Sequence, residues 1–268
     1  ELGSIAPGRR ADAILTSDLR RLPIEHVIAR GRTVAVDGEI QVDCPHLDWP
    51  ADARATVHLG KTLTAADFTV TAPEGANRVK ARVIGVVENQ APTRALAAEL
   101  DVTDGLVAPD TSNDVAHIAL VERHRGTGKV TSGFVSGFGY KGRMAMASTV
   151  AHDSHHMIVV GTSREDMARA ANRLGDVGGG LTVWRDGREL AVVELRIAGL
   201  MSDSRAAEVA AKGQNMVEAM QLCGCTLNNA YMQHSLLALV VIPELRISDL
   251  GLVDVTKFQI TDLFKATA

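Results

Sequence analysis

The sequence predicts an α+β protein in which a small β-sandwich segment precedes a mixed α/β domain. Three observations support this class. Short β-prone runs and tight-turn dipeptides fill the first forty residues, and β-rich segments dominate again from Val57 onward. Two helical patterns occur between those later segments, without the regular alternation of a parallel βαβ fold.

Composition narrows the class of protein. The chain has 268 residues, of which 46% are hydrophobic and only 3% aromatic, so aliphatic side chains must build the core. The net charge of −4 and the lack of a basic block argue against nucleic acid as a partner. The longest apolar run, residues 236–242, is too short to cross a bilayer, so we expect no membrane segment.

Two further features of the sequence concern its cellular location and its extent. The cysteines are Cys44, Cys223 and Cys225, an odd set that does not suggest a disulfide framework, so we expect a cytoplasmic location. The chain starts at Glu1 without a signal-peptide pattern. We therefore expect it to begin partway through a larger protein.

The first segment reads as a small β unit of three or four strands. A Pro7-Gly8 turn precedes an apolar run, and the residues 24–29 and 33–36 are β-prone. Asp37-Gly38 is a strong hairpin dipeptide. Such a unit is too small to be stable alone.

A linker is expected over residues 44–52, where Pro and Trp interrupt the β pattern. We place the boundary near Arg54. The resulting domains are residues 1–54 and residues 55–268.

The second domain should contain several strands and two main helices. The expected strands are residues 68–71, 79–87, 118–121, 145–150 and 157–161, and the last two should be buried on both faces because they are almost continuously apolar. Ser163 should cap a helix that ends at three glycines from Gly178, and Asp186-Gly187 should form a hairpin between residues 181–184 and 190–197. A longer helix is expected over residues 204–222.

The densest group of chemically active side chains is the run from His152 to His156, which holds three imidazoles, a carboxylate and a hydroxyl between two apolar strands. A continuing strand would divide them between its two sides, whereas a turn would bring them together. An imidazole beside a carboxylate can shuttle protons near neutral pH. The alternatives are a structural hydrogen-bond network and, less favoured, metal ligation, for which no second motif completes a ligand set.

Other polar motifs allow more than one interpretation. Residues 122–128 could form a polar pocket, anchor a neighbouring loop or be a solvated hairpin tip. The glycine-rich residues 136–142 lack the Lys-Thr or Lys-Ser pair of a phosphate-binding loop. Ser202 or Asp203 should cap the long helix, and Cys223 with Cys225 fits a buried helix end better than a metal site.

Several of these motifs, taken in order, resemble the carboxy-terminal domain of bacterial adenine deaminases. The resemblance runs from about Val79 to Phe264. The motifs that carry it are residues 121–128, 137–139, 147–155, 197–203 and 251–255. One departure is His156, where the family more often has Asn. Residues 3–12 resemble the closing β segment of amidohydrolases, which follows a metal-binding (β/α)₈ barrel.

The resemblance implies hydrolysis of adenine to hypoxanthine and ammonia by a hydroxide held between two divalent metal ions, iron or manganese. The barrel ligands that would hold those ions have no counterpart in this chain, so no metal ligand is assigned here. The barrel of the same enzyme is therefore an expected partner, together with adenine and a homo-oligomer.

Within this chain we expect His152, Asp153 and His155 to have catalytic roles. Ser154, Glu122, Arg123 and His124 are the expected substrate-binding residues.

Two rival hypotheses stay open. The domain could be a structural or oligomerisation module whose histidine cluster only stabilises the fold. The enzyme could also act on another cyclic amidine or amide, because a fold does not choose a substrate.

Overall fold

The computed structural model describes residues 2–45 and 47–265, and it forms two compact units divided after Asp48. Residue 1, residue 46 in the expected linker and residues 266–268 lie outside the described part. The described residues mix helices with several sheets, which confirms the α+β class. None of their helices has both the length and the apolar character that crossing a membrane would need.

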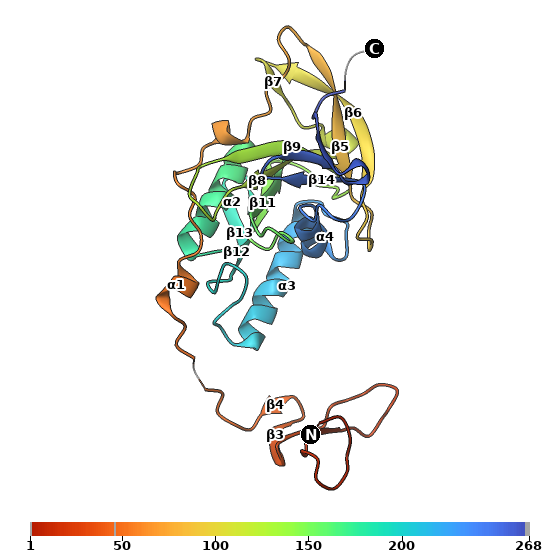
Figure 1. Ribbon diagram of the computed structural model, residues 1–268, viewed down its shortest axis with the longest axis vertical. Coiled ribbons are helices and arrows are strands. Elements are labelled where there is room, and N and C mark those ends of the chain that lie inside the picture. The colour runs from red at the N-terminus through yellow and green to blue at the C-terminus, as the bar shows by residue number, and fades with distance from the viewer. Residues whose placement is uncertain (1, 46, 266–268) are drawn as a thin grey trace. The chain divides into compact units, whose positions relative to one another are not determined.

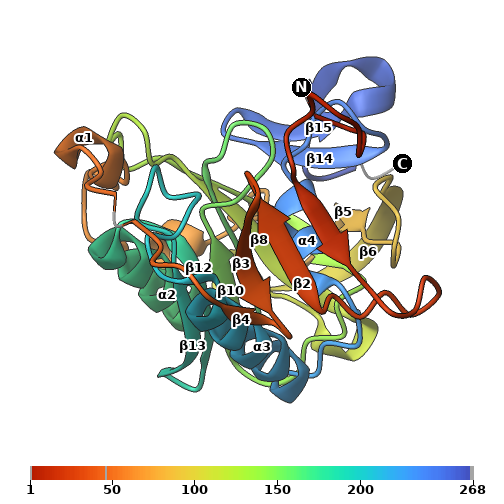
Figure 2. The ribbon, with the colours of Figure 1, turned by 90° about the horizontal axis from the view of Figure 1, so that it is seen from below.

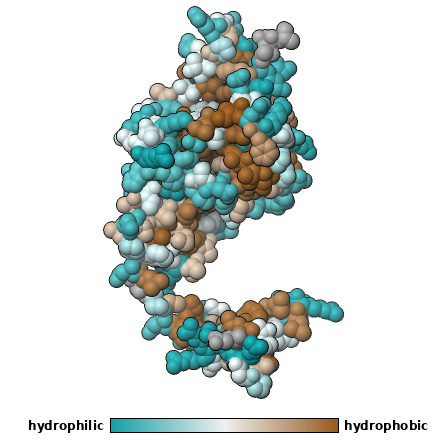
Figure 3. Space-filling model, viewed as in Figure 1, coloured by the Kyte–Doolittle hydropathy of each residue, from teal (hydrophilic) through white to brown (hydrophobic). Residues whose placement is uncertain are grey.

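The first unit is a four-stranded antiparallel sheet in the order β1-β2-β3-β4. Its strands are β1 (Ala13–Leu15), β2 (His26–Ala29), β3 (Arg32–Val36) and β4 (Glu39–Ile40). The expected turn is present, with positive φ at Asp37 and Gly38 as a tight hairpin requires. No residue of this unit that the structure describes is buried, and apolar side chains lie open on its surface (Figure 3).

A short helix, α1 (Ala51–Arg54), follows where an irregular linker was expected. The Ala198 amide donates to the Ala53 carbonyl at 2.6 Å, and Arg54 pairs with Asp203 at 2.9 Å. These contacts fix α1 to the second unit, so the boundary between the units lies before the expected position at Arg54.

The second unit is built around a nine-stranded sheet in the order β13-β12-β10-β11-β8-β9-β5-β6-β7 (Figure 1). Among the described residues its pairs are antiparallel except for β5 with β9. The strands are β5 (Arg78–Gly85), β6 (Arg94–Thr103), β7 (Leu106–Val107), β8 (Val115–Val121), β9 (Val130–Ser136), β10 (Met144–Ser148), β11 (Met157–Gly161), β12 (Gly180–Arg185) and β13 (Arg188–Glu194).

Helices cover both faces of this sheet (Figures 1 and 2). On one face α2 (Arg164–Val177) packs Met167 against Val159, and on the other α3 (Ala206–Leu222) and α4 (Ala230–Leu236) lie near Val160. Successive residues of a strand point to opposite faces, so β10 and β11 are buried on both sides, as predicted from their apolar runs.

The two main predicted helices are confirmed. The Ser163 hydroxyl accepts a hydrogen bond from the Asp166 amide, and α2 ends at Gly178 with φ +83°. Helix α3 begins at Ala206, two residues after the expected start, and ends at Leu222 as expected. The predicted hairpin at Asp186-Gly187 joins β12 to β13, although β13 ends at Glu194 and does not reach residue 197.

One predicted strand is wrong. Residues 68–71 were expected to be extended, but a 3₁₀ turn occupies Ala65–Phe68, because Thr64 and Asp67 form a reciprocal capping box at its start. Thr71 makes only an isolated bridge to Leu106. A separate three-stranded antiparallel sheet of β14 (Leu245–Ser248), β15 (Gly251–Asp254) and β16 (Gln259–Thr261) was not predicted.

Candidate functional site

The run from His152 to His156 forms the connection between β10 and β11, and it is a turn. The His152 amide donates to the Ser235 carbonyl at 3.0 Å, and the His155 amide donates to the Ala151 carbonyl at 2.7 Å. His155 has φ +48°, which reverses the chain before β11 begins. Of the two arrangements considered from the sequence, the structure has the one that brings the side chains together.

The turn has an exposed tip and a buried base. Asp153 and Ser154 are exposed, His152 and His155 are half-buried, and His156 is buried. The rings of His152 and His155 meet edge to face with their centroids 5.3 Å apart. The three residues expected to be catalytic, His152, Asp153 and His155, are therefore close together at the open end of the turn.

Hydrogen bonding and burial favour the neutral form of His155. Burial lowers the pKa of His155, and the nearby His152 and Arg123 lower it further. Its Nδ1 accepts the Ala151 amide proton at 3.3 Å, so in the neutral ring Nε2 carries the proton. His155 is thus a neutral imidazole that can donate through Nε2 near neutral pH.

Arg123 is fully buried behind the turn, with 1% of its surface exposed. Its guanidinium donates to three backbone carbonyls, those of His155 at 2.6 Å, Thr56 at 3.1 Å and Ala198 at 3.2 Å. A Cβ on Gly199 would lie 2.9 Å from this guanidinium, so the glycine leaves room for it. Arg123 therefore connects the turn to two distant segments and is not directed toward solvent.

Glu122 organises the loop that follows β8. Its carboxylate accepts from the backbone amides of His124, Arg125 and Thr127 at 2.5, 2.8 and 3.0 Å, and from the Thr127 hydroxyl at 2.9 Å. Burial acts to raise the pKa of Glu122, but these hydrogen bonds outweigh it and lower the pKa to about 2. Glu122 is thus a buried, ionised anchor for the loop, not a group at a solvated tip.

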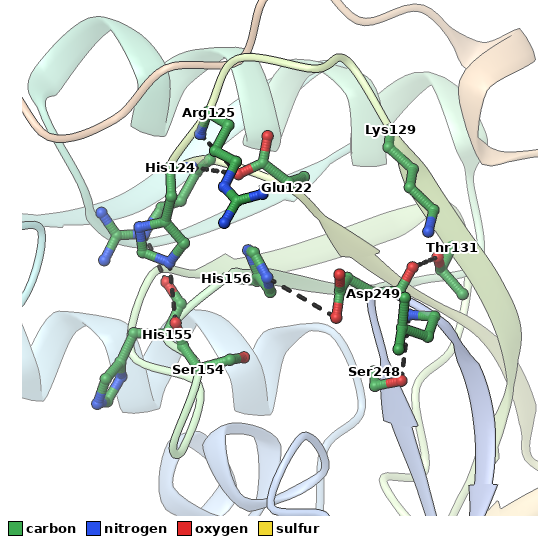
Figure 4. Close-up of polar contacts among 12 residues, drawn as sticks. Glu122, His124, Arg125, Lys129, Thr131, Ser154, His155, His156, Ser248 and Asp249 are labelled. Carbon is green, nitrogen blue, oxygen red and sulfur yellow. Dashed lines mark hydrogen bonds and ion pairs between the residues drawn. The ribbon is translucent and has the colours of Figure 1, made fainter. Parts of the chain in front are cut away.

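A row of polar groups connects this loop to the base of the turn (Figure 4). His124 Nε2 lies 2.8 Å from the Ser154 carbonyl, and the His124 and His156 rings are 4.8 Å apart. His156 Nε2 lies 3.9 Å from the Asp249 carboxylate. Burial lowers the pKa of His156, as does His124, while Asp249 opposes the shift.

Asp249 was missed by the sequence analysis. It lies in the turn between β14 and β15, and no local pattern relates it to His156, which is far away in the chain. The Thr131 hydroxyl donates to its backbone carbonyl at 2.9 Å (Figure 4), which fixes the turn against β9. Only the folded structure brings Asp249 to the histidines.

The described residues do not fit a metal ion. No group of three or more His, Cys, Asp or Glu among residues 2–45 and 47–265 is placed to hold one. His155 Nδ1 in the turn and His124 Nε2 in the loop after β8 already contact backbone groups. Cys223 and Cys225 are buried at the end of α3, where burial raises the pKa of both thiols.

The glycine-rich loop after β9 binds a carboxylate of the protein itself. The amides of Gly137 and Gly139 donate to the two Asp114 carboxylate oxygens at 2.7 and 2.8 Å. These amides are the groups that a phosphate-binding loop would use. The expectation that residues 136–142 do not cradle phosphate agrees with these contacts.

Comparison with known proteins identifies the family. A family model described as "Adenine deaminase C-terminal domain" matches residues 90–259. The chain is 75% identical over 269 residues to an adenine deaminase of Ruegeria pomeroyi, which covers 100% of this chain and 45% of that protein. It is 71% identical over 263 residues to an adenine deaminase of Paracoccus denitrificans, covering 98% of this chain and 43% of that protein.

A relative with lower identity also matches nearly the whole of this chain over less than half of its own length. An adenine deaminase of Moorella thermoacetica is 46% identical over 263 residues, which is 98% of this chain and 44% of that protein. The chain thus spans less than half the length of these relatives. Because the family model covers most of the chain, the chain belongs to the adenine deaminase C-terminal domain family.

Proposed function

We propose that this chain is the carboxy-terminal part of an adenine deaminase, which hydrolyses adenine to hypoxanthine and ammonia. The observation that carries the proposal is the match to proteins named adenine deaminase along nearly the whole chain, at 75% identity for the Ruegeria pomeroyi protein. The chain spans 45% of that relative, so the remainder of the enzyme is expected to be its amino-terminal barrel.

On this proposal the exposed end of the histidine turn faces the reaction site. His152, Asp153 and His155 combine a carboxylate with two imidazoles whose rings lie 5.3 Å apart, a set suited to moving a proton as ammonia leaves. Ser154 and His124 would position adenine beside them. The contacts of Arg123 support a role in holding the turn in place, and those of Glu122 a role in holding the loop after β8, not in touching substrate.

The divalent ions, iron or manganese, belong to the barrel in this proposal, and no residue of this chain is proposed as a ligand. Such ions activate a water molecule for attack on the ring carbon that bears the amine.

A cytoplasmic location is part of the proposal. It rests on three cysteines, Cys44, Cys223 and Cys225, all described and all free.

The test uses the full-length enzyme with His152→Ala, Asp153→Asn and His155→Ala. Each should lower kcat for adenine by about 10²- to 10⁴-fold, the usual contribution of a general acid or base. The melting temperature should change little for the exposed Asp153. Asp104→Asn is the matched control, because Asp104 is also an exposed aspartate in a turn. Unchanged turnover in all three variants would remove the catalytic part of the proposal.

A structural or assembly role is the second candidate. It is favoured by the contacts of His124, His156 and Asp249 with one another and with backbone groups. Size-exclusion chromatography of the same variants separates the two functions. A loss of homo-oligomer before any loss of kcat would favour the assembly role.

A further inference from the structure

An apolar groove of about 440 Å³ lies beside the histidine turn, between the segment that follows α4 and the small sheet of β14, β15 and β16. Its apolar lining includes Val240, Leu250, Phe258 and Ile260, and its polar rim includes Asp153 and Asp249. The groove and the turn therefore share one face of the second unit.

The apolar side chains of the groove are unusually open to solvent. Leu250 is 66% exposed, Phe258 84% and Ile260 55%. Figure 3 shows apolar residues gathered on this side of the second unit, over β14 and the neighbouring chain. A contiguous patch of large apolar side chains with a polar rim is typical of an interaction surface.

The groove is held rigidly by buried polar contacts. Arg246 is 1% exposed, and its guanidinium donates to the carbonyls of Ile242 and Leu236, both at 2.8 Å. These bonds fix the segment that carries Val240. Phe258 has φ +49°, a left-handed conformation that bulky residues rarely adopt, and its amide donates to the Val255 carbonyl. An exposed apolar surface that is fixed in this way is already shaped for a partner.

We infer that this groove is covered by the part of the adenine deaminase polypeptide that lies outside this chain. The inference rests on the proposed function. More than half of the Ruegeria pomeroyi relative, of which this chain spans 45%, is available to fill the groove.

The position of the groove next to the histidine turn favours the rest of the polypeptide as its occupant. Asp153 is both a rim residue of the groove and a member of the turn that the proposed function places at the reaction site. The body that contains the reaction site must then lie over the groove as well. With Asp153 and Asp249 on the rim, the matching surface should be apolar with basic or hydrogen-bond-donating groups at its edge.

Photo-crosslinking in the full-length protein tests the inference. The substitution Phe258→p-benzoylphenylalanine puts a light-activated ring in place of another aromatic ring at the groove. We expect a cross-link within one polypeptide, with mass spectrometry locating the partner peptide outside the 268-residue chain. Leu222→p-benzoylphenylalanine is the control, because Leu222 is 65% exposed at the end of α3, as open as Leu250.

A second pair of variants tests the apolar character of the contact. Adding Leu250→Asp to the probe at position 258 should lower the yield of this cross-link several-fold, whereas adding Leu222→Asp should leave it unchanged. Equal yields in the two double variants would contradict an apolar contact at the groove.

Two other results would overturn the inference. A cross-linked product of twice the mass, with peptides from a second copy, would assign the groove to an interface between subunits. Absence of any protein cross-link at position 258 would show a groove open to water. Adenine turnover is measured on the unsubstituted full-length protein: an intrachain cross-link at position 258, together with no turnover by the unsubstituted protein, would support the covered groove and contradict the proposed function.

Discussion

Both units of the chain contain paired β-strands, but only the second unit buries its strands in a core. The first unit has four paired strands and well-formed turns, yet none of its described residues is buried, and Ile14 and Leu15 are 54% and 48% exposed. The second unit buries every residue of β8, β10 and β11. Strand and turn patterns are thus enough to form a sheet, but burial decides whether the sheet is stable by itself.

Separating the two units tests whether the first one folds without a buried core. Residues 1–48 alone should be unfolded, because a two-layer core is missing, while residues 49–268 should unfold cooperatively. Circular dichroism and urea titration of the two peptides would measure this. A cooperative transition in the peptide of residues 1–48 would show that this sheet is stable without a buried core.

Removing one buried guanidinium tests how much a single buried polar group stabilises the second unit. Arg123→Met should lower the free energy of unfolding by about 3 kcal/mol, since each buried carbonyl left without a donor costs roughly 1–3 kcal/mol. Trp184 fluorescence during urea unfolding would report the change. The control Arg143→Met removes an exposed ion pair with Glu165 and should cost less than about 1 kcal/mol. Similar losses in both variants would mean that burial of Arg123 contributes nothing.

A smaller effect is expected at Glu122, and it depends on pH. Glu122→Gln should lower the free energy of unfolding by about 2 kcal/mol at pH 7, as for hydrogen bonds to a charged group. The folded pKa is about 2, below the ordinary 4.5, so the carboxylate stabilises the fold above pH 4.5. This advantage over Gln should disappear as the pH falls from 4.5 toward 2. A difference between the two proteins that stays constant over this range would refute the linkage.

Much of the second unit could be predicted because its signals are local. The apolar runs of β10 and β11, the Ser163 cap and the Asp186-Gly187 turn each depend on neighbouring residues. Strand β6 was missed since it is rich in Ala and nearly all exposed, with only Leu100 buried. Its partner β5 supplies the pairing that its own sequence does not suggest.

Part of the candidate site could also be predicted from the sequence. The turn and its histidines are consecutive, so the sequence could reveal them. The role of Arg123 could not be read in the same way, because its partners include distant segments at Thr56 and Ala198. Asp249 reaches His156 only through the packing of β14 and β15 against β9.

The parallel junction in the large sheet has a consequence for how the protein opens. β5 pairs with β9 over only two residue pairs, Ile84 with Val135 and Gly85 with Ser136. Nearer the start of β5, residues 262–264 contact the strand: the Arg82 guanidinium donates to the carbonyls of Asp262 and Phe264. These contacts with residues 262–264 thus reinforce the short junction, and if they are lost we expect the β5–β6 ribbon to open before the rest of the sheet.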